Sequence, residues 1–158
     1  MFDNFPMADD DPSRVTVIEL YKTAVEMADR VSARRGVANA FFLSIQTALV
    51  SIGALSFSNL RTPWLISLVL AFAGVAISIV WRLQLRSYRD LNRAKFAVIN
   101  EIETRFPVRP FSDEWKVLSE TREDSWWRRY ADLGTSERTV PLVFALLHIA
   151  TFAGRLTI

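Results

Sequence analysis

Cysteine is absent from this sequence, and histidine occurs once, at His148. Without cysteine the chain has no disulfide framework, no thiolate metal site and no cysteine nucleophile. A single histidine supports neither a multi-histidine metal site nor a Ser-His-Asp arrangement. The five glycines form neither a Walker-type nor a dinucleotide-type loop. We therefore expect no enzyme, no cofactor and no catalytic or metal-binding residues.

Charge is almost absent between residues 36 and 81, where Arg61 is the only charged residue. It separates 25 uncharged residues from another 20, and about 20 helical residues cross roughly 30 Å of hydrocarbon. The sequence therefore predicts membrane helices over 36–58 and 63–82, joined as an antiparallel hairpin. A buried soluble hairpin would also be apolar all round, but 158 residues with no second comparable core leave little to cover it.

Positive charge lies on both flanks of this hairpin and not at its turn. Five basic residues precede it and five follow it closely, whereas the turn holds Arg61 alone. Cytoplasmic flanks retain positive charge, which predicts a cytoplasmic N-terminus, cytoplasmic residues 83–135 and an external turn. The acidic start of the chain lacks the basic and apolar regions of a secretory signal peptide.

The sequence also predicts helices in the polar flanks, and we expect one all-α domain over residues 1–158. Residues 1–11 hold four aspartates without periodicity and are expected to be a disordered leader. Residues 12–35 are expected to form an amphipathic cytoplasmic helix, and 83–135 further cytoplasmic helices. The apolar stripe predicted for the first of these helices is Val17, Leu20, Ala24, Met27 and Val31.

Small and hydroxylic residues recur at spacings of four and three along the first membrane helix, on one narrow face. They are Ala40, Ser44, Thr47, Ser51, Ala54 and Ser58. The amides Asn39 and Gln46 lie on another face. Small residues allow close helix packing in lipid, and amides there need partners, so we expect this set to join copies of the chain. A water-lined pore wall is the alternative.

Lys95 falls on the predicted apolar face of the helix that follows the hairpin. The long side chain could lie along that face with its charge in water. The more specific hypothesis is an ion pair with Glu26, or with Asp29, that docks the two cytoplasmic helices.

Tryptophans beside cations are typical of a cytoplasmic membrane interface. We expect that role for Trp81, Trp126, Trp127, Arg128 and Arg129. A nucleic-acid patch has similar composition, but this basic stretch is short and flanked by aspartates, so no nucleic-acid partner is expected. Residues 139–156 are expected to form a third membrane-embedded helix, with an interfacial helix as the alternative. His148 within it is expected to be packed and internally bonded.

Several segments carry a family resemblance: YKTAVEMADRVSARRGVANAFFLSIQTALV from Tyr21, SYRDLNRAKFAVINEIE from Ser87, FPVRPFSDEW from Phe106 and TSERTVPLVF from Thr135. Together they resemble the RipA-type small bacterial octameric membrane proteins. More loosely, the hairpin with its cytoplasmic helix is similar to the SLATT-type membrane effectors of bacterial conflict systems. The resemblance implies an eightfold homo-oligomer in the bacterial inner membrane, serving phage defence by permeabilising the host membrane.

Two functions follow as hypotheses. In the first, the protein is a pore-forming or membrane-disrupting effector, held inactive until a protein trigger reorganises its cytoplasmic helices. In the second, it is a non-conducting membrane scaffold that recruits a cytoplasmic partner. A dense ring of pore-facing charge would favour a channel, and the hairpin sequence offers none.

Overall fold

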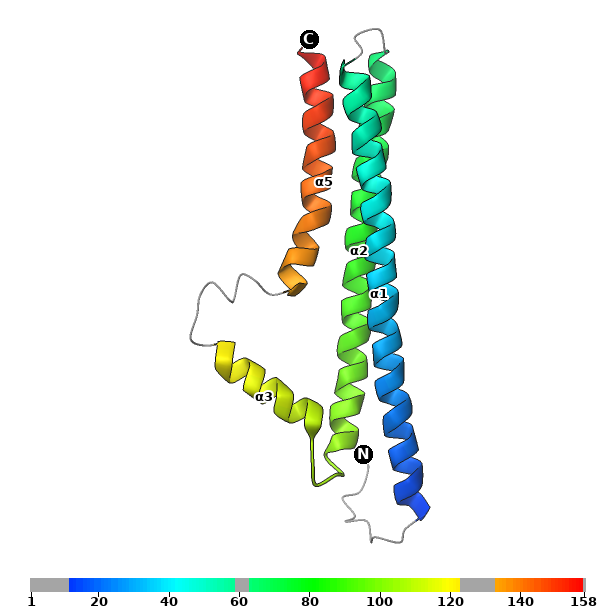
Figure 1. Cartoon of the computed structure of the whole chain (residues 1–158), viewed down its shortest axis with the longest axis vertical. Helices are drawn as coiled ribbons and strands as arrows, with labels where there is room; N and C mark the ends of the chain where they lie inside the picture. The colour runs from blue at the N-terminus through cyan, green and yellow to red at the C-terminus, as the bar shows by residue number, and fades with distance from the viewer. Residues whose placement is uncertain (1–11, 59–62, 123–132, 158) are drawn as a thin grey trace. The chain divides into compact units, whose positions relative to one another are not determined.

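The structure is a computed structural model that describes residues 12–58, 63–122 and 133–157. Its described part contains four helices and no strand: α1 (Pro12–Ser58), α2 (Trp64–Glu103), α3 (Pro110–Arg122) and α5 (Leu133–Leu156) (Figure 1). The predicted all-α fold is confirmed. Three of the helices, α1, α2 and α5, are long and apolar enough to cross a membrane.

The two long helices each join a membrane segment to a polar extension without a break. α1 passes through Gly36 as regular helix, because no proline or positive-φ residue interrupts it there. α2 ends at Glu103, where amide bonds to carbonyls three residues earlier tighten the last turn, and Pro107 follows. α3 starts at Pro110, a residue that suits the first turn because it has no N–H to lose there. α5 likewise begins six residues before the expected Thr139.

Tertiary contacts divide the chain into two compact units. The membrane unit comprises residues 35–87 and 131–158, and the flanking unit comprises residues 1–34 and 88–130. The boundaries at 34/35 and 87/88 fall close to the predicted ends of the membrane hairpin, residues 36 and 82.

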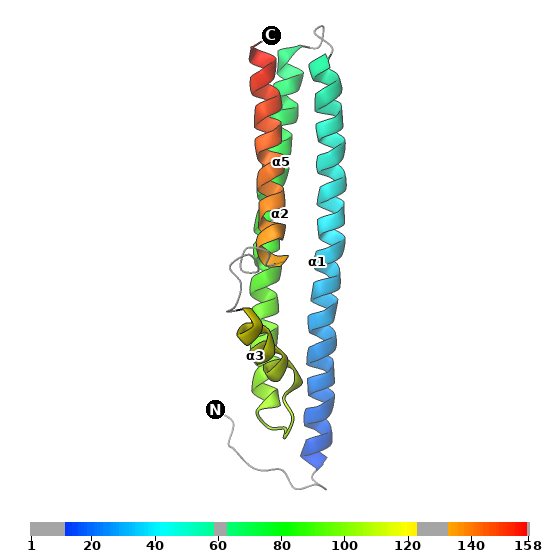
Figure 2. The ribbon, with the colours of Figure 1, turned by 60° about the vertical axis from the view of Figure 1, so that its left-hand side comes forward.

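In the membrane unit, segments of α1 and α2 pack with α5 (Figures 1 and 2). Its core is aromatic: the rings of Phe42 and Trp81 are stacked with centroids 5.7 Å apart, and Phe144 of α5 lies 6.2 Å from Trp81. Most large apolar side chains face outward instead, as Phe72 does with 76% of its surface exposed. This many exposed apolar side chains suits contact with lipid or with other copies of the chain.

In the flanking unit, the start of α1 packs against the end of α2, and α3 joins them. Ala28, Val31 and Ile99 are buried there. Phe96 of α2 contacts Phe111 of α3 edge to face, with ring centroids 5.7 Å apart. The predicted apolar stripe of α1 is only partly correct, because Leu20 and Met27 are 58% and 50% exposed.

Candidate functional site

A buried polar network links all three helices of the membrane unit. The side-chain amide of Gln46 in α1 donates to the Gly74 carbonyl oxygen at 3.0 Å and to Ser78 Oγ at 2.7 Å, both in α2. Its Oε1 lies 2.8 Å from Nε2 of His148 in α5. Because the Gln46 nitrogen is the donor in the first two bonds, Oε1 accepts, and His148 carries its proton on Nε2. Lipid offers no alternative partner, so this network ties the helices together.

Gly74 allows the close approach on which this network depends. A Cβ atom at position 74 would overlap the His148 ring. Gln46 is fully buried and His148 is 5% exposed, so neither faces lipid. The expectation of a packed, internally bonded histidine is confirmed.

The network also places α5 at membrane depth. Gln46 lies near the middle of the first membrane segment, and His148 lies near the middle of residues 139–156. Since their side chains are bonded, the two residues lie at the same depth. A helix lying in the interface could not reach that depth, so the membrane-embedded alternative is the one that fits.

A second hydrogen bond in the membrane unit holds the side chain of Trp81, which the sequence assigned to the membrane interface. The indole Nε1–H donates to Asn39 Oδ1 at 2.9 Å, and Trp81 is only 3% exposed. Trp81 therefore lies inside the helix bundle, because its ring packs on Phe42 and its N–H has a partner there. The amides Asn39 and Gln46 were expected to join copies, but both bond within one chain, and buried Gln46 cannot reach another copy.

The small-residue stripe of α1 lies outside this bundle. Ala40, Ser44, Thr47, Ser51 and Ala54 are all exposed. The three hydroxyl groups donate to carbonyl oxygens one turn earlier, at 2.8–2.9 Å. The stripe therefore presents a small, flat surface whose hydrogen-bond donors are already used.

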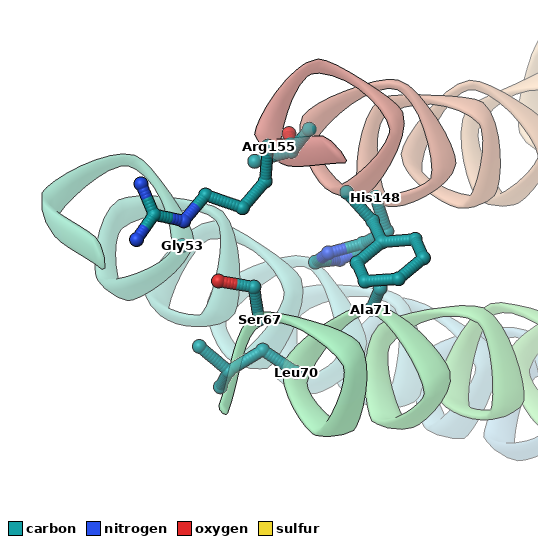
Figure 3. A pocket seen from close by; sticks show the side chains of 8 residues that line it. Gly53, Ser67, Leu70, Ala71, His148 and Arg155 are labelled. Atoms are coloured by element: carbon teal, nitrogen blue, oxygen red, sulfur yellow. The ribbon is translucent and has the colours of Figure 1, made fainter. Parts of the chain in front are cut away.

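A small cavity lies beside His148 in the membrane unit (Figure 3). Its volume is about 10 Å³, which is room for about one water molecule. Its lining comes from α1, α2 and α5: Gly53, Ser67, Leu70, Ala71, His148, Thr151, Phe152 and Arg155. This space is too small for a hydrated ion, so it offers no conducting path through a single chain.

In the flanking unit, the carboxylate of Glu103 anchors α3. It is fully buried and accepts four bonds: from the amides of Phe111 and Ser112, the Ser112 hydroxyl and the Tyr21 hydroxyl, at 2.7–3.0 Å. We call this arrangement the Glu103 clamp. Two of the donors are first-turn amides of α3, which lack helical partners and favour a negative charge.

These bonds decide the protonation states of the clamp, which lies outside the membrane-spanning segments. Burial raises the pKa of the Glu103 carboxyl, but the hydrogen bonds from Phe111, Ser112 and Tyr21 outweigh it and hold the pKa below its ordinary value. Burial, followed by the bond to Glu103 and its negative charge, raises the pKa of Tyr21 to about 12. At neutral pH the carboxylate is therefore ionised and the Tyr21 hydroxyl is a donor.

Lys95 does not form the predicted ion pair. Among the described residues it has no acidic partner within 4 Å, and Glu26 instead bonds Arg30 at 2.7 Å, one turn along α1. Asp29 is exposed. Lys95 instead lines an apolar groove between α1 and α2 of the flanking unit.

Some predicted positions lie outside the described residues. They are the leader 1–11, the turn 59–62, the side chain of Ser58, and Trp126, Trp127, Arg128 and Arg129. Among the described residues, no cluster of three or more His, Cys, Asp or Glu side chains could hold a metal ion.

Comparison with known proteins gives one result. Residues 18–157 match the sequence profile of the octameric membrane protein family (8xMP). No curated protein and no solved structure matches the chain. The family match covers most of the chain and reaches into both units.

Proposed function

Since this chain belongs to the octameric membrane protein family, we propose that its copies assemble in the bacterial inner membrane along the small-residue stripe of α1 and together act as a pore-forming or membrane-disrupting effector in phage defence. The observation that carries the proposal is the exposure of Ala40, Ser44, Thr47, Ser51 and Ala54, while the amide and histidine groups of the same unit are internally bonded.

The stripe suits contact between copies better than contact with lipid. Small side chains let two helix backbones approach closely, and in lipid that packing drives helix association. The remaining outward surface carries large apolar side chains, which suit lipid contact. The stripe therefore differs from the rest of the outward surface in carrying small side chains, which suits it to contact between helices.

The conducting path, in this proposal, lies between copies. The cavity inside one membrane unit holds about one water molecule, so an ion path needs surfaces from several copies. In the alternative arrangement, in which the stripe lines the path instead of joining copies, the hydroxyl oxygens of Ser44, Thr47 and Ser51 would accept hydrogen bonds from water. The defence role rests on the family resemblance of the sequence, and a protein trigger acting on the cytoplasmic helices would complete it. No enzymatic step, cofactor or nucleic acid is involved.

The proposed orientation places the N-terminus and the flanking unit in the cytoplasm. The charge bias across the turn supports it. Arg35 and Glu137 approach within 3.7 Å at the end of the membrane unit that this orientation makes cytoplasmic. A cysteine at position 113 should be labelled only in opened cells, whereas labelling from outside intact cells would show the reverse orientation.

Assembly and conductance test the main proposal. Native mass measurement should show an oligomer, and Ser44→Leu or Ser51→Leu should lower its size, because added volume at a tight interface costs about 1–3 kcal/mol. Ala150→Leu, on an exposed position of α5, is the matched control and should leave the assembly unchanged.

Planar-bilayer recording then separates the two functions. A pore predicts single-channel or lytic currents from the wild-type oligomer, lost in Ser44→Leu, together with lost protection against phage. The alternative is a non-conducting scaffold. It predicts an intact oligomer with no current, whose protection depends on a cytoplasmic partner.

A further inference from the structure

The groove at Lys95 combines apolar walls with one positive charge. It is lined by Ala24 and Met27 of α1 and by Ala94, Lys95 and Val98 of α2, and its volume is about 270 Å³. This is below the roughly 300–1,000 Å³ of small-molecule sites, and suits one large side chain. Met27 and Val98 are 50% and 56% exposed, so the groove is open. A partly buried cation without an acidic partner favours an occupant that brings a carboxylate beside an apolar group.

The flanking unit displays such a pair on α3. Trp115 is 63% exposed, and the preceding residue, Glu114, is exposed and has no ion pair among the described residues. Exposed tryptophans that fill pockets are typical anchors of protein interfaces. The Glu103 clamp holds the start of α3 in place, so Trp115 is presented by a fixed helix.

Within one chain, α3 cannot fill this groove. α3 packs on the side of α2 that carries Phe96, through the contact with Phe111. Val98, in the groove, is two residues further along, and two helical residues rotate the side chain by about 200°. The groove and the α3 contact therefore lie on roughly opposite sides of α2. An occupant of the groove must come from elsewhere.

We propose that the groove receives Trp115 from α3 of a second copy of this chain, with Glu114 of that copy paired to Lys95. Each copy then offers one groove and one α3, and the two surfaces are different. Contacts between unlike surfaces propagate from copy to copy, and they close into a ring where the rotation between copies divides a full turn. An eightfold ring of this kind matches the octameric description of the family. This contact lies in the flanking unit and adds to the proposed α1 stripe without depending on it.

Charge reversal tests the ion pair in the full-length protein. Lys95→Glu and Glu114→Lys should each weaken the octamer about tenfold or more in dilution-dependent native mass measurements, because each places like charges together. The double variant should recover assembly. Arg93→Glu, exposed on α2 but outside the groove, is the matched control. Single variants that assemble like wild type, or a double variant as weak as the sum of the singles, would overturn the proposal.

Crosslinking tests the geometry separately, and the absence of native cysteine removes any background. A chain carrying both Ala94→Cys and Glu114→Cys should oxidise to a ladder of bands beyond the dimer, because each copy joins two neighbours. Each single-cysteine chain should stay uncrosslinked. A ladder that stops at the dimer, or no crosslink in an intact octamer, would overturn this contact. Neither result would contradict the proposed contact along the α1 stripe. A wild-type monomer would overturn both.

Discussion

The two units satisfy their buried polar groups by different chemistry. Among the described residues of the membrane unit, the buried network around Gln46 uses neutral partners: Ser78, a backbone carbonyl oxygen and His148. The flanking unit buries an ionised carboxylate, Glu103, and surrounds it with four donors. Bonds to a charged group are roughly twice as strong as neutral ones, but an unpaired charge in lipid is far more costly than an unpaired amide. The surroundings of each unit thus decide which kind of polar anchor it can carry.

Removing the charged anchor should have the largest effect. Glu103→Ala leaves the amides of Phe111 and Ser112 and the Tyr21 hydroxyl without their acceptor. We expect a loss of about 3 kcal/mol from the flanking unit, because buried donors are left unpaired. Hydrogen exchange should speed up at Phe111 and Ser112 and stay unchanged in α5. Equal acceleration in α5 would show that the two units do not unfold separately.

The second-largest loss of stability is expected in the membrane unit, where Gly74 and the His148 ring pack closely. Gly74→Ala places a methyl group where the His148 ring lies, so α5 must move away from α2. We expect a loss of about 2 kcal/mol, as for other overpacked sites. Thermal unfolding in detergent measures it. Ala97→Ser, at an exposed position of α2 outside the groove, controls for a small substitution in this helix. A Gly74→Ala protein of wild-type stability would contradict the contact between Gly74 and His148.

The two units should also differ in how their stability responds to acid. The ordinary pKa of the Glu103 carboxyl is 4.5 and its folded pKa is lower, so its contribution is complete above pH 4.5 and is lost as the pH falls through the folded value. The Phe111 and Ser112 amides should therefore lose protection in acid. Glu103→Gln should abolish this pH dependence. A wild-type profile that matches the Gln variant would show that Glu103 is not ionised in the fold.

The smallest effect is expected from one neutral bond. Ser78→Ala removes one of the two bonds donated by Gln46 and leaves the bond to the Gly74 carbonyl oxygen. We expect a loss of about 0.6 kcal/mol, the average for side-chain bonds between membrane helices. Unfolding Ser78→Ala and Gly74→Ala side by side in detergent compares the stability lost with one hydrogen bond to the stability lost through overpacking. A larger loss in Ser78→Ala than in Gly74→Ala would show that the hydrogen bond matters more.

The sequence by itself determined the membrane helices, the polar flanks and the small stripe. The length of an uncharged segment is a local property of the sequence. The spacing of four and three between small residues along one helix is also local. The family resemblance was confirmed by the match over residues 18–157. Sequence reasoning also indicated that Gln46 and His148 needed polar partners, since lipid supplies none.

Only the tertiary structure decided which groups those partners were. Asn39 bonds Trp81, Gln46 bonds His148, and Glu103 bonds residues eight and nine positions away across a turn. Lys95 faces an apolar groove instead of Glu26. Helical periodicity tells which residues share a face, but the rotation of each helix against its neighbours follows from packing the whole set of side chains. That rotation turned Trp81 inward, left Leu20 and Met27 exposed, and brought the His148 ring onto Gly74.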